Sequence, residues 1–229
     1  MITAITTCMG RREHLEVTLP FMLAAFDKVI VVDWSCPQAS GEWAASEGAS
    51  VAYKYGERYF HRSKARNHGA KLVTSEYIAF VDADTLCMPE LQVELKSIRQ
   101  TNMLLASRTH SGADIPNLFG FVACSTDAFW NAGGYDESYE GWGHEDSQLR
   151  GALLLESKLT PLRVSGMALG AIAHDNALRD ANHKDTIHAT STANFKKLYS
   201  YFDKFGIKDW MSDPRTDSIT FKNDPRLGL

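Results

Sequence analysis

Length, composition and charge limit the classes of protein that this sequence can encode. The chain has 229 residues, of which 44% are apolar, so it can bury a full core, and its formal net charge is −4. Nucleic-acid-binding domains are usually basic, and we therefore expect no nucleic-acid partner. No apolar run is as long as a membrane span, so we expect at most a peripheral membrane association through a partner.

The beginning of the chain and its cysteines indicate a cytoplasmic protein. The first residues enter a strand-like pattern directly, without the basic and apolar blocks of a secretion signal. The four cysteines do not have the spacing of metal ligands (Cys8, Cys36, Cys87 and Cys124). Reduced thiols are the simplest interpretation, because disulfides are rare in the cytoplasm.

The first half of the chain alternates between strand-like and helix-like patterns. Strands are predicted at 1–8, 28–34, 50–55 and 77–82, and helices at about 11–26, 41–47 and 63–73. In the last of these helices, Leu72 is expected to face inward. This alternation predicts an α/β fold with a mostly parallel central sheet. Ligands of such sheets bind at the carboxyl ends of the strands, where Thr6, Asp33 and Asp82 fall.

The second half of the chain is less regular. Helices are predicted after Pro89 to about residue 99, at 143–155 and at 194–205, and strands at 103–107, 119–125 and 167–173. Gly133 and Gly134 indicate a turn. Residues 209–229 are polar and are expected to wrap the surface or to stay mobile.

Asp82-Ala83-Asp84 ends the fourth predicted strand. Two carboxylates two positions apart can point to the same side of the chain. Such a pair forms a hard oxygen site that suits Mg²⁺ or Mn²⁺ with a phosphate as a further ligand. A strand that ends in an ordinary polar turn would contain the same residues, so this motif alone leaves both interpretations open.

The second chemical motif is the segment 141–146, Gly-Trp-Gly-His-Glu-Asp. Glycines on both sides would give Trp142 an unusual backbone and a face open to a ligand such as a sugar. Asp146 could remove a proton from an acceptor hydroxyl as a general base. Alternatively, Trp142 belongs to the core and the acids only cap a helix.

Together the two motifs resemble the inverting glycosyltransferases of the GT-A fold. The resemblance is to the β-1,4-galactosyltransferases and to the bacterial family 2 and chondroitin-polymerase-like enzymes, and it runs from Thr6 to about His174. It implies one domain, 1–229, with a Rossmann-like sheet flanked by helices, in which 1–100 bind the nucleotide sugar and 101–229 bind the acceptor. The sequence departs from the galactosyltransferases at His144, where they have glycine.

The resemblance also implies roles for individual residues. Asp84 and His174 would bind Mn²⁺ or Mg²⁺, and Asp82 would share the metal or hold the ribose. Asp146 would be the catalytic base, and Glu145 would orient that base or the acceptor. The nucleotide sugar would contact Thr6, Arg11, Asp33, Phe60, Arg62, Arg66, Asp82 and Ala83, and the acceptor would contact Trp142, Gly143 and Glu145. Without the resemblance, a capped imidazole at His174 and arginines on a solvated helix face would be ordinary structural features.

The expected function is metal-dependent, inverting transfer of a hexose or N-acetylhexosamine from a UDP-sugar. The acceptor would be a hydroxyl of a glycan, a lipid-linked sugar or a peptide. A nucleotidyltransferase acting on a sugar phosphate is one alternative, although residues 6–12 are a poor version of its glycine-rich basic loop. A non-catalytic sugar-binding module is another, although two acidic motifs would be superfluous there. Residues 180–192 could form a lid over the donor or an ordinary surface loop.

Overall fold

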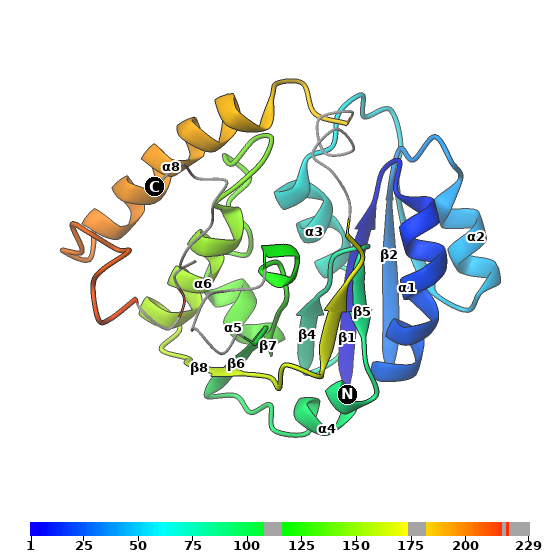
Figure 1. The fold of residues 1–229 in the computed structure, drawn as a ribbon, viewed down its shortest axis with the longest axis horizontal. Coiled ribbons are helices and arrows are strands. Elements are labelled where there is room, and N and C mark those ends of the chain that lie inside the picture. Colours follow the sequence, from blue (N-terminus) through cyan, green and yellow to red (C-terminus); the bar gives the residue numbers. More distant parts are fainter. Residues whose placement is uncertain (108–115, 174–181, 217–218, 220–229) are drawn as a thin grey trace.

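A seven-stranded mixed sheet runs through the middle of the protein (Figure 1). This computed structural model describes residues 1–107, 116–173, 182–216 and 219. The strands lie in the order β3-β2-β1-β4-β7-β6-β8. Their bounds are β1 Ile2–Cys8, β2 Lys28–Trp34, β3 Ser50–Lys54, β4 Tyr77–Phe80, β6 Asn102–Leu105, β7 Val122–Ser125 and β8 Thr160–Arg163.

The pairing confirms the predicted α/β fold with a mostly parallel sheet. The strands β3, β2, β1 and β4 pair in parallel, and β7 is antiparallel to both of its neighbours, β4 and β6. The edge strand β8 is again parallel to β6. All strands of this sheet except β7 therefore run in one direction, and their carboxyl ends share one edge.

Alternate side chains of the central strands pack into two separate hydrophobic cores. In β2, Ile30 and Val32 belong to one core, whereas Val29 and Val31 belong to the other. Successive side chains of a strand point to opposite faces, so a strand that is apolar throughout needs a cover on both. Helices α1 (Arg12–Ala25), α2 (Ser40–Ser46) and α4 (Glu90–Leu95) pack in one core, and α3 (Arg62–Ala70), α5 (Thr126–Asn131), α6 (Glu145–Leu155) and α8 (Ile187–Asp203) pack in the other (Figure 1).

A small second sheet joins two distant parts of the chain. Strand β5 (Thr85–Cys87) pairs with β9 (Leu169–Ala171) in antiparallel register, with Thr85 opposite Ala171. The pairing continues beyond the strands, because the Ile172 N–H donates to the Asp84 carbonyl at 2.8 Å. Ile172, the residue that follows β9, therefore lies next to the Asp82-Ala83-Asp84 turn. A short 3₁₀ helix, Pro116–Leu118, precedes β7.

Several elements differ from the sequence-based expectations. The strands β5 and β8 and the helix α5 were not predicted, and α8 begins at Ile187 rather than at residue 194. Helix α3 ends at Ala70, so Leu72, which was expected to face inward, is 48% exposed. None of the helices in the described part of the chain is long and apolar enough to cross a membrane.

Candidate active site

Arg66 lies at the centre of a cluster of charged side chains at the carboxyl edge of the sheet. Its guanidinium donates to Asp146 Oδ1 at 2.5 Å and to Asp82 Oδ1 at 2.7 Å. The Glu145 carboxylate lies 3.8 Å from the same group, and the Arg66 side chain is only 3% exposed. A single buried arginine of α3 thus joins the turn that follows β4 to the first turn of α6.

Glu145 is held in its charged form by two arginines. Arg62 donates to Glu145 Oε1 at 2.7 Å, and the Glu145 side chain is 3% exposed. Burial alone would favour the neutral acid, but Arg62 and then Arg66 outweigh it and lower the pKa of Glu145 to about 2. A carboxylate that stays ionised in this way can orient its neighbours but is a poor proton acceptor at neutral pH.

Asp146 has the opposite electrostatic environment, although it is the next residue. Burial raises the pKa of Asp146 to about 6; Arg66 opposes this rise, and the negative charges of Glu145 and Asp82 add to it. The Tyr135 hydroxyl donates to Asp146 Oδ1 at 3.3 Å, and the aspartate side chain is 16% exposed. A carboxylate with this pKa and with access to solvent can accept a proton near neutral pH.

The segment before α6, residues 140–144, is called the tryptophan loop below. Gly141 and Gly143 have φ values of 69° and 99°, as expected for glycines that shape an unusual backbone. A Cβ atom on Gly141 would lie 2.4 Å from Thr190 Cγ2, so the helix α8 requires glycine there. Trp142 is half-buried, and its backbone N–H donates to Thr190 Oγ1 at 3.1 Å.

Asn194 of α8 fixes the same loop from within the protein. It is 2% exposed, and its amide donates to the carbonyl oxygens of Glu140 at 2.9 Å and Trp142 at 3.3 Å. Loop carbonyls that lack partners in regular structure are thereby satisfied. The position of Trp142 therefore depends on the docking of α8.

The turn Asp82-Ala83-Asp84 leaves both aspartates more exposed than the alanine between them. Ala83 is buried, whereas the aspartates on either side of it are half-buried. The Thr85 N–H donates to the Asp82 carbonyl at 3.0 Å, which closes the turn. Gly120 allows the Asp82 carboxylate to approach, because a Cβ atom on this glycine would lie 2.2 Å from Asp82 Oδ2.

Arg11 is a cationic side chain near this turn. Burial lowers the pKa of Arg11, and the nearby Asp84 carboxylate opposes that change. No group of three histidine, cysteine or acidic side chains forms a metal site within residues 1–107, 116–173, 182–216 and 219. The expected third ligand, His174, lies outside these residues.

Two of the residues expected to contact the nucleotide, Thr6 and Asp33, lie on β1 and β2. Thr6 is 1% exposed, and its hydroxyl has no partner among the described residues. Asp33 is 5% exposed and accepts the N–H groups of Cys36 and Gly41, both at 2.7 Å. In this structure the Asp33 carboxylate thus supports the loop between β2 and α2.

Phe60 contacts the beginning of the segment that leads into α8. Its N–H donates to the Asn182 carbonyl at 2.8 Å, and its ring lies 6.0 Å from that of His183. The Asn182 amide donates in turn to the Met9 carbonyl at 2.9 Å. The described part of 180–192 therefore crosses the carboxyl edge of the sheet, as the yellow-orange ribbon that leads into α8 at the top of Figure 1 shows.

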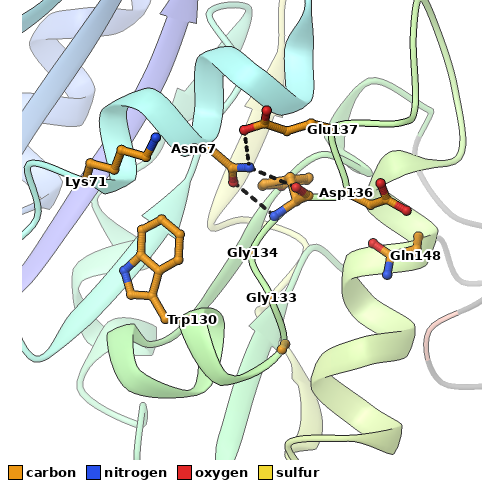
Figure 2. Close-up of a pocket in the computed structure, with 10 residues that line it drawn as sticks. Asn67, Lys71, Trp130, Gly133, Gly134, Asp136, Glu137 and Gln148 are labelled. Carbon is orange, nitrogen blue, oxygen red and sulfur yellow. Dashed lines mark hydrogen bonds between the residues drawn. The ribbon is translucent and has the colours of Figure 1, made fainter.

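A hollow of about 470 Å³, shown in Figure 2, adjoins the charged cluster through Tyr135, which lines the hollow and bonds Asp146. Its lining consists of Asn67, Lys71, Trp130, Ala132, Gly133, Gly134, Tyr135, Asp136, Glu137 and Gln148. The Asn67 amide donates to the Tyr135 carbonyl at 2.8 Å and accepts the Tyr135 N–H at 3.0 Å. This reciprocal pair fixes the tyrosine whose hydroxyl reaches Asp146.

Sequence reasoning assigned no role to Asn67, Gly120 or Tyr135. The Gly133–Gly134 turn is the sequence signal that precedes Tyr135.

Comparison with known families identifies the class of protein. The family model described as "Glycosyl transferase family 2" matches residues 3–118, about half of the chain. The model described as "N-terminal domain of galactosyltransferase" matches residues 105–174. The chain therefore belongs to glycosyltransferase family 2. No curated protein sequence matches it significantly.

Solved structures share the fold at low sequence identity. The mannosyltransferase PcManGT from Pyrobaculum calidifontis, in complex with GDP-Man and Mn²⁺, is 15% identical over 95% of this chain and 67% of its own, with a TM-score of 0.62. Glucosyl-3-phosphoglycerate synthase from Mycobacterium tuberculosis, with Mn²⁺, UDP-glucose and phosphoglyceric acid, is 15% identical over 88% and 79%, with a TM-score of 0.60. Residues 1–349 of TarS from S. aureus, in complex with UDP, are 15% identical over 99% and 76%, with a TM-score of 0.58. The protein is a glycosyltransferase with the GT-A fold.

Proposed function

We propose that this glycosyltransferase moves a hexose or N-acetylhexosamine from a UDP-sugar to a hydroxyl group of a glycan or glycoconjugate, with inversion at the anomeric carbon. The observation that carries the proposal is the pair of hydrogen bonds from Arg66 to Asp82 and to Asp146. Asp82 lies in the proposed donor half, just after β4, and Asp146 lies in the first turn of α6, which follows the tryptophan loop. A donor bound at Asp82 would therefore be within reach of a base at Asp146.

The donor half is proposed to need a divalent cation. Carboxylate oxygens are the ligands that Mn²⁺ and Mg²⁺ prefer, and Asp84 supplies them with Asp82 beside it. His174 is the proposed third ligand. The reason is that the pairing of β5 with β9 brings Ile172, two residues earlier in the sequence, next to Asp84. When bound, the ion would neutralise the charge that builds on the departing diphosphate. Two of the compared structures contain Mn²⁺ together with a nucleotide diphosphate sugar.

Residues from several elements of the donor half are proposed to hold the nucleotide. Arg11 lies near Asp84 and would bind the diphosphate, with Arg62 from the beginning of α3. Asp33, Thr6 and Phe60 would contact the nucleoside. Ala83 would do so through its backbone, because its small side chain is buried. Each of these contacts is a proposal that a complex with UDP would test.

Asp146 is the proposed catalytic base. Above pH about 6 it carries a negative charge and can take the proton of the acceptor hydroxyl while that oxygen attacks the anomeric carbon. The attack comes from the side opposite the leaving nucleotide, so the configuration inverts. Glu145 would orient Asp146 or the acceptor. Trp142 and Gly143 would line the acceptor sugar, with the indole face stacked against its C–H bonds.

The acceptor and the cellular location belong to the same proposal. The galactosyltransferase-type model over residues 105–174 supports a related acceptor half. The acceptor would be a growing glycan, a lipid-linked sugar or a peptide. The four free cysteines are compatible with the cytoplasmic setting that we propose.

A donor screen tests the proposal directly. The protein is incubated with each UDP-sugar, Mn²⁺ and candidate acceptors, and we expect UDP release with one donor and a product of inverted anomeric configuration by NMR. Asp146→Asn should nearly abolish transfer while UDP binding, measured by calorimetry, is kept. Asp127→Asn is the matched control, since Asp127 is an exposed acid in the first turn of α5. Full transfer by Asp146→Asn, or retention of configuration, would overturn the assignment.

A further inference from the structure

Cys8 and Cys36 lie side by side at the carboxyl ends of β1 and β2. Cys8 is the last residue of β1, Cys36 follows β2, and their sulfur atoms are 4.0 Å apart. The Ser40 hydroxyl contacts both, at 3.1 Å from Cys8 Sγ and 2.9 Å from Cys36 Sγ. The backbone N–H of Gly10 donates to Cys36 Sγ at 3.3 Å. One hydroxyl and one N–H group thus hold two free thiols together.

The two thiols differ in exposure and in acidity. Cys8 is fully buried, whereas Cys36 is half-buried. The hydrogen bond with Cys8, and then those from Ser40 and from the Gln38 and Gly10 backbone, lower the pKa of Cys36 against the effect of burial. The contact with Cys36 and burial raise the pKa of Cys8. Cys36 therefore has thiolate character, and Cys8 is a protected thiol beside it.

The other two cysteines have neither property. Cys87 and Cys124 are buried, and burial raises the pKa of each to about 12. They serve as internal controls for thiol reactivity.

We propose that Cys36 is an oxidation site at which a peroxide leads to a Cys8–Cys36 disulfide, and that this disulfide weakens donor binding. The Cys36 sulfur attacks one peroxide oxygen, the O–O bond breaks, and the thiol proton leaves with the other oxygen as water, which produces a sulfenic acid. The Cys8 sulfur then attacks the Cys36 sulfur and displaces hydroxide, which takes the Cys8 proton and leaves as a second water. Two thiols and one hydrogen peroxide thus yield one disulfide and two waters.

The position of the pair connects it to the donor site. A disulfide bond is about 2.05 Å long, so the two sulfurs must approach each other by about 2 Å. That movement must change the hydrogen bond between the Gly10 N–H and Cys36 Sγ, and Gly10, with a φ of 67°, shapes the turn that leads to Arg11. The Cys36 N–H is also bonded to Asp33. Oxidation would therefore displace two residues that we propose as donor contacts, and this second part of the inference rests on the proposed function.

Mass spectrometry after a hydrogen peroxide pulse tests the oxidation site without any assay of activity. In the wild-type protein we expect a peptide that links Cys8 to Cys36, while Cys87 and Cys124 stay alkylatable after denaturation. Cys8→Ser should stop at a Cys36 sulfenic acid that dimedone traps, and Cys36→Ser should give neither product. Circular dichroism checks that both variants are folded. Equal oxidation of Cys36→Ser, or a disulfide between other cysteines or between molecules, would overturn the proposal.

Calorimetry with UDP and Mn²⁺ tests the effect on the donor site. A charge-assisted contact is worth about 1.5–3 kcal/mol, so loss of the Arg11 contact should weaken UDP binding by about tenfold or more. Dithiothreitol should restore the affinity, and Cys36→Ser should bind UDP equally before and after peroxide. Unchanged affinity of the disulfide form would refute the link to the donor site. If neither form binds any UDP-sugar, the proposed function fails, while the mass measurement still decides the oxidation site.

Discussion

Replacing Arg66 with glutamine should move the pH dependence of transfer upward. Arg66 is the guanidinium that opposes the raised pKa of Asp146, which is about 6 in the intact cluster. Without it, Arg62 would still lower the pKa of Asp146, but the cluster would have lost one positive charge. Fewer positive charges favour the protonated acid, so the pKa of Asp146 should rise and the base should be neutral at higher pH than before.

The size of the shift follows from the distances. An opposite charge within hydrogen-bond distance, here 2.5 Å, typically lowers a carboxyl pKa by about 1–3 units. A rise of about two units would leave about one-tenth of Asp146 ionised at pH about 7, compared with about nine-tenths in the wild type. Transfer at that pH should therefore fall by about tenfold and recover at pH about 9. Breaking a buried ion pair should also cost about 3–5 kcal/mol of the free energy of unfolding.

The assay is UDP release from the preferred UDP-sugar, measured as kcat between pH about 5 and about 9. Arg66→Lys keeps the positive charge, so the acid limb of its profile of kcat against pH should stay near that of the wild type. The maximal rate should still fall, because one ammonium group cannot bind both carboxylates as the guanidinium does. Arg12→Gln is the control, since it breaks an exposed pair with Glu16. A folded Arg66→Gln protein with an acid limb unchanged near pH 6 would refute the electrostatic reasoning.

Three further predictions concern the two halves of the site. Asp84→Ala should weaken Mn²⁺-dependent UDP binding by more than about tenfold in calorimetry, and undiminished binding would remove it from the metal site. Gly120→Ala should destabilise the protein by about 1–3 kcal/mol in thermal unfolding, because the new Cβ meets Asp82 Oδ2 at 2.2 Å. Gly166→Ala, whose nearest atom would be 3.8 Å away, should be nearly neutral, and equal effects would contradict the argument. Asn194→Ala should raise the acceptor KM and leave the donor Kd unchanged, whereas an effect on the donor alone would contradict its role in the tryptophan loop.

Elements with a strong local signal could be predicted from the sequence. The run Val29–Val32 is apolar at every position and forms a strand buried on both faces. Elements that depend on tertiary contacts could not be predicted in this way. Strand β8 contains Pro161 and forms at the sheet edge, where β6 offers it hydrogen bonds. The early start of α8 had a visible signal, because Thr186 caps the helix by accepting the Ala189 N–H.

The residue types of the site could be predicted, but their partners could not. Aspartates after a strand and acids at the beginning of a helix follow from local sequence, and both lie where they were expected. Arg66 and Asp146 are 80 residues apart, and nothing in either motif indicates that they pair. An arginine near a nucleotide site is equally suited to phosphate and to carboxylate. In this structure Arg66 binds two carboxylates, so its first role is to position the proposed base, and any contact with the nucleotide sugar would be additional.

The proposed acceptor half depends on contacts with α8 as well as on its own motif. His144, where the galactosyltransferases have glycine, has a φ of 72°, a strained conformation for a residue with a side chain. Its ring lies 5.2 Å from that of Phe195, and its Nε2 is 3.4 Å from Ser191 Oγ. Asn194 holds Trp142 from the same helix. The strain at His144 is thus offset by contacts with a helix far along the chain, and substitutions in α8 should change the acceptor that the enzyme uses while the donor site at Asp84 stays intact.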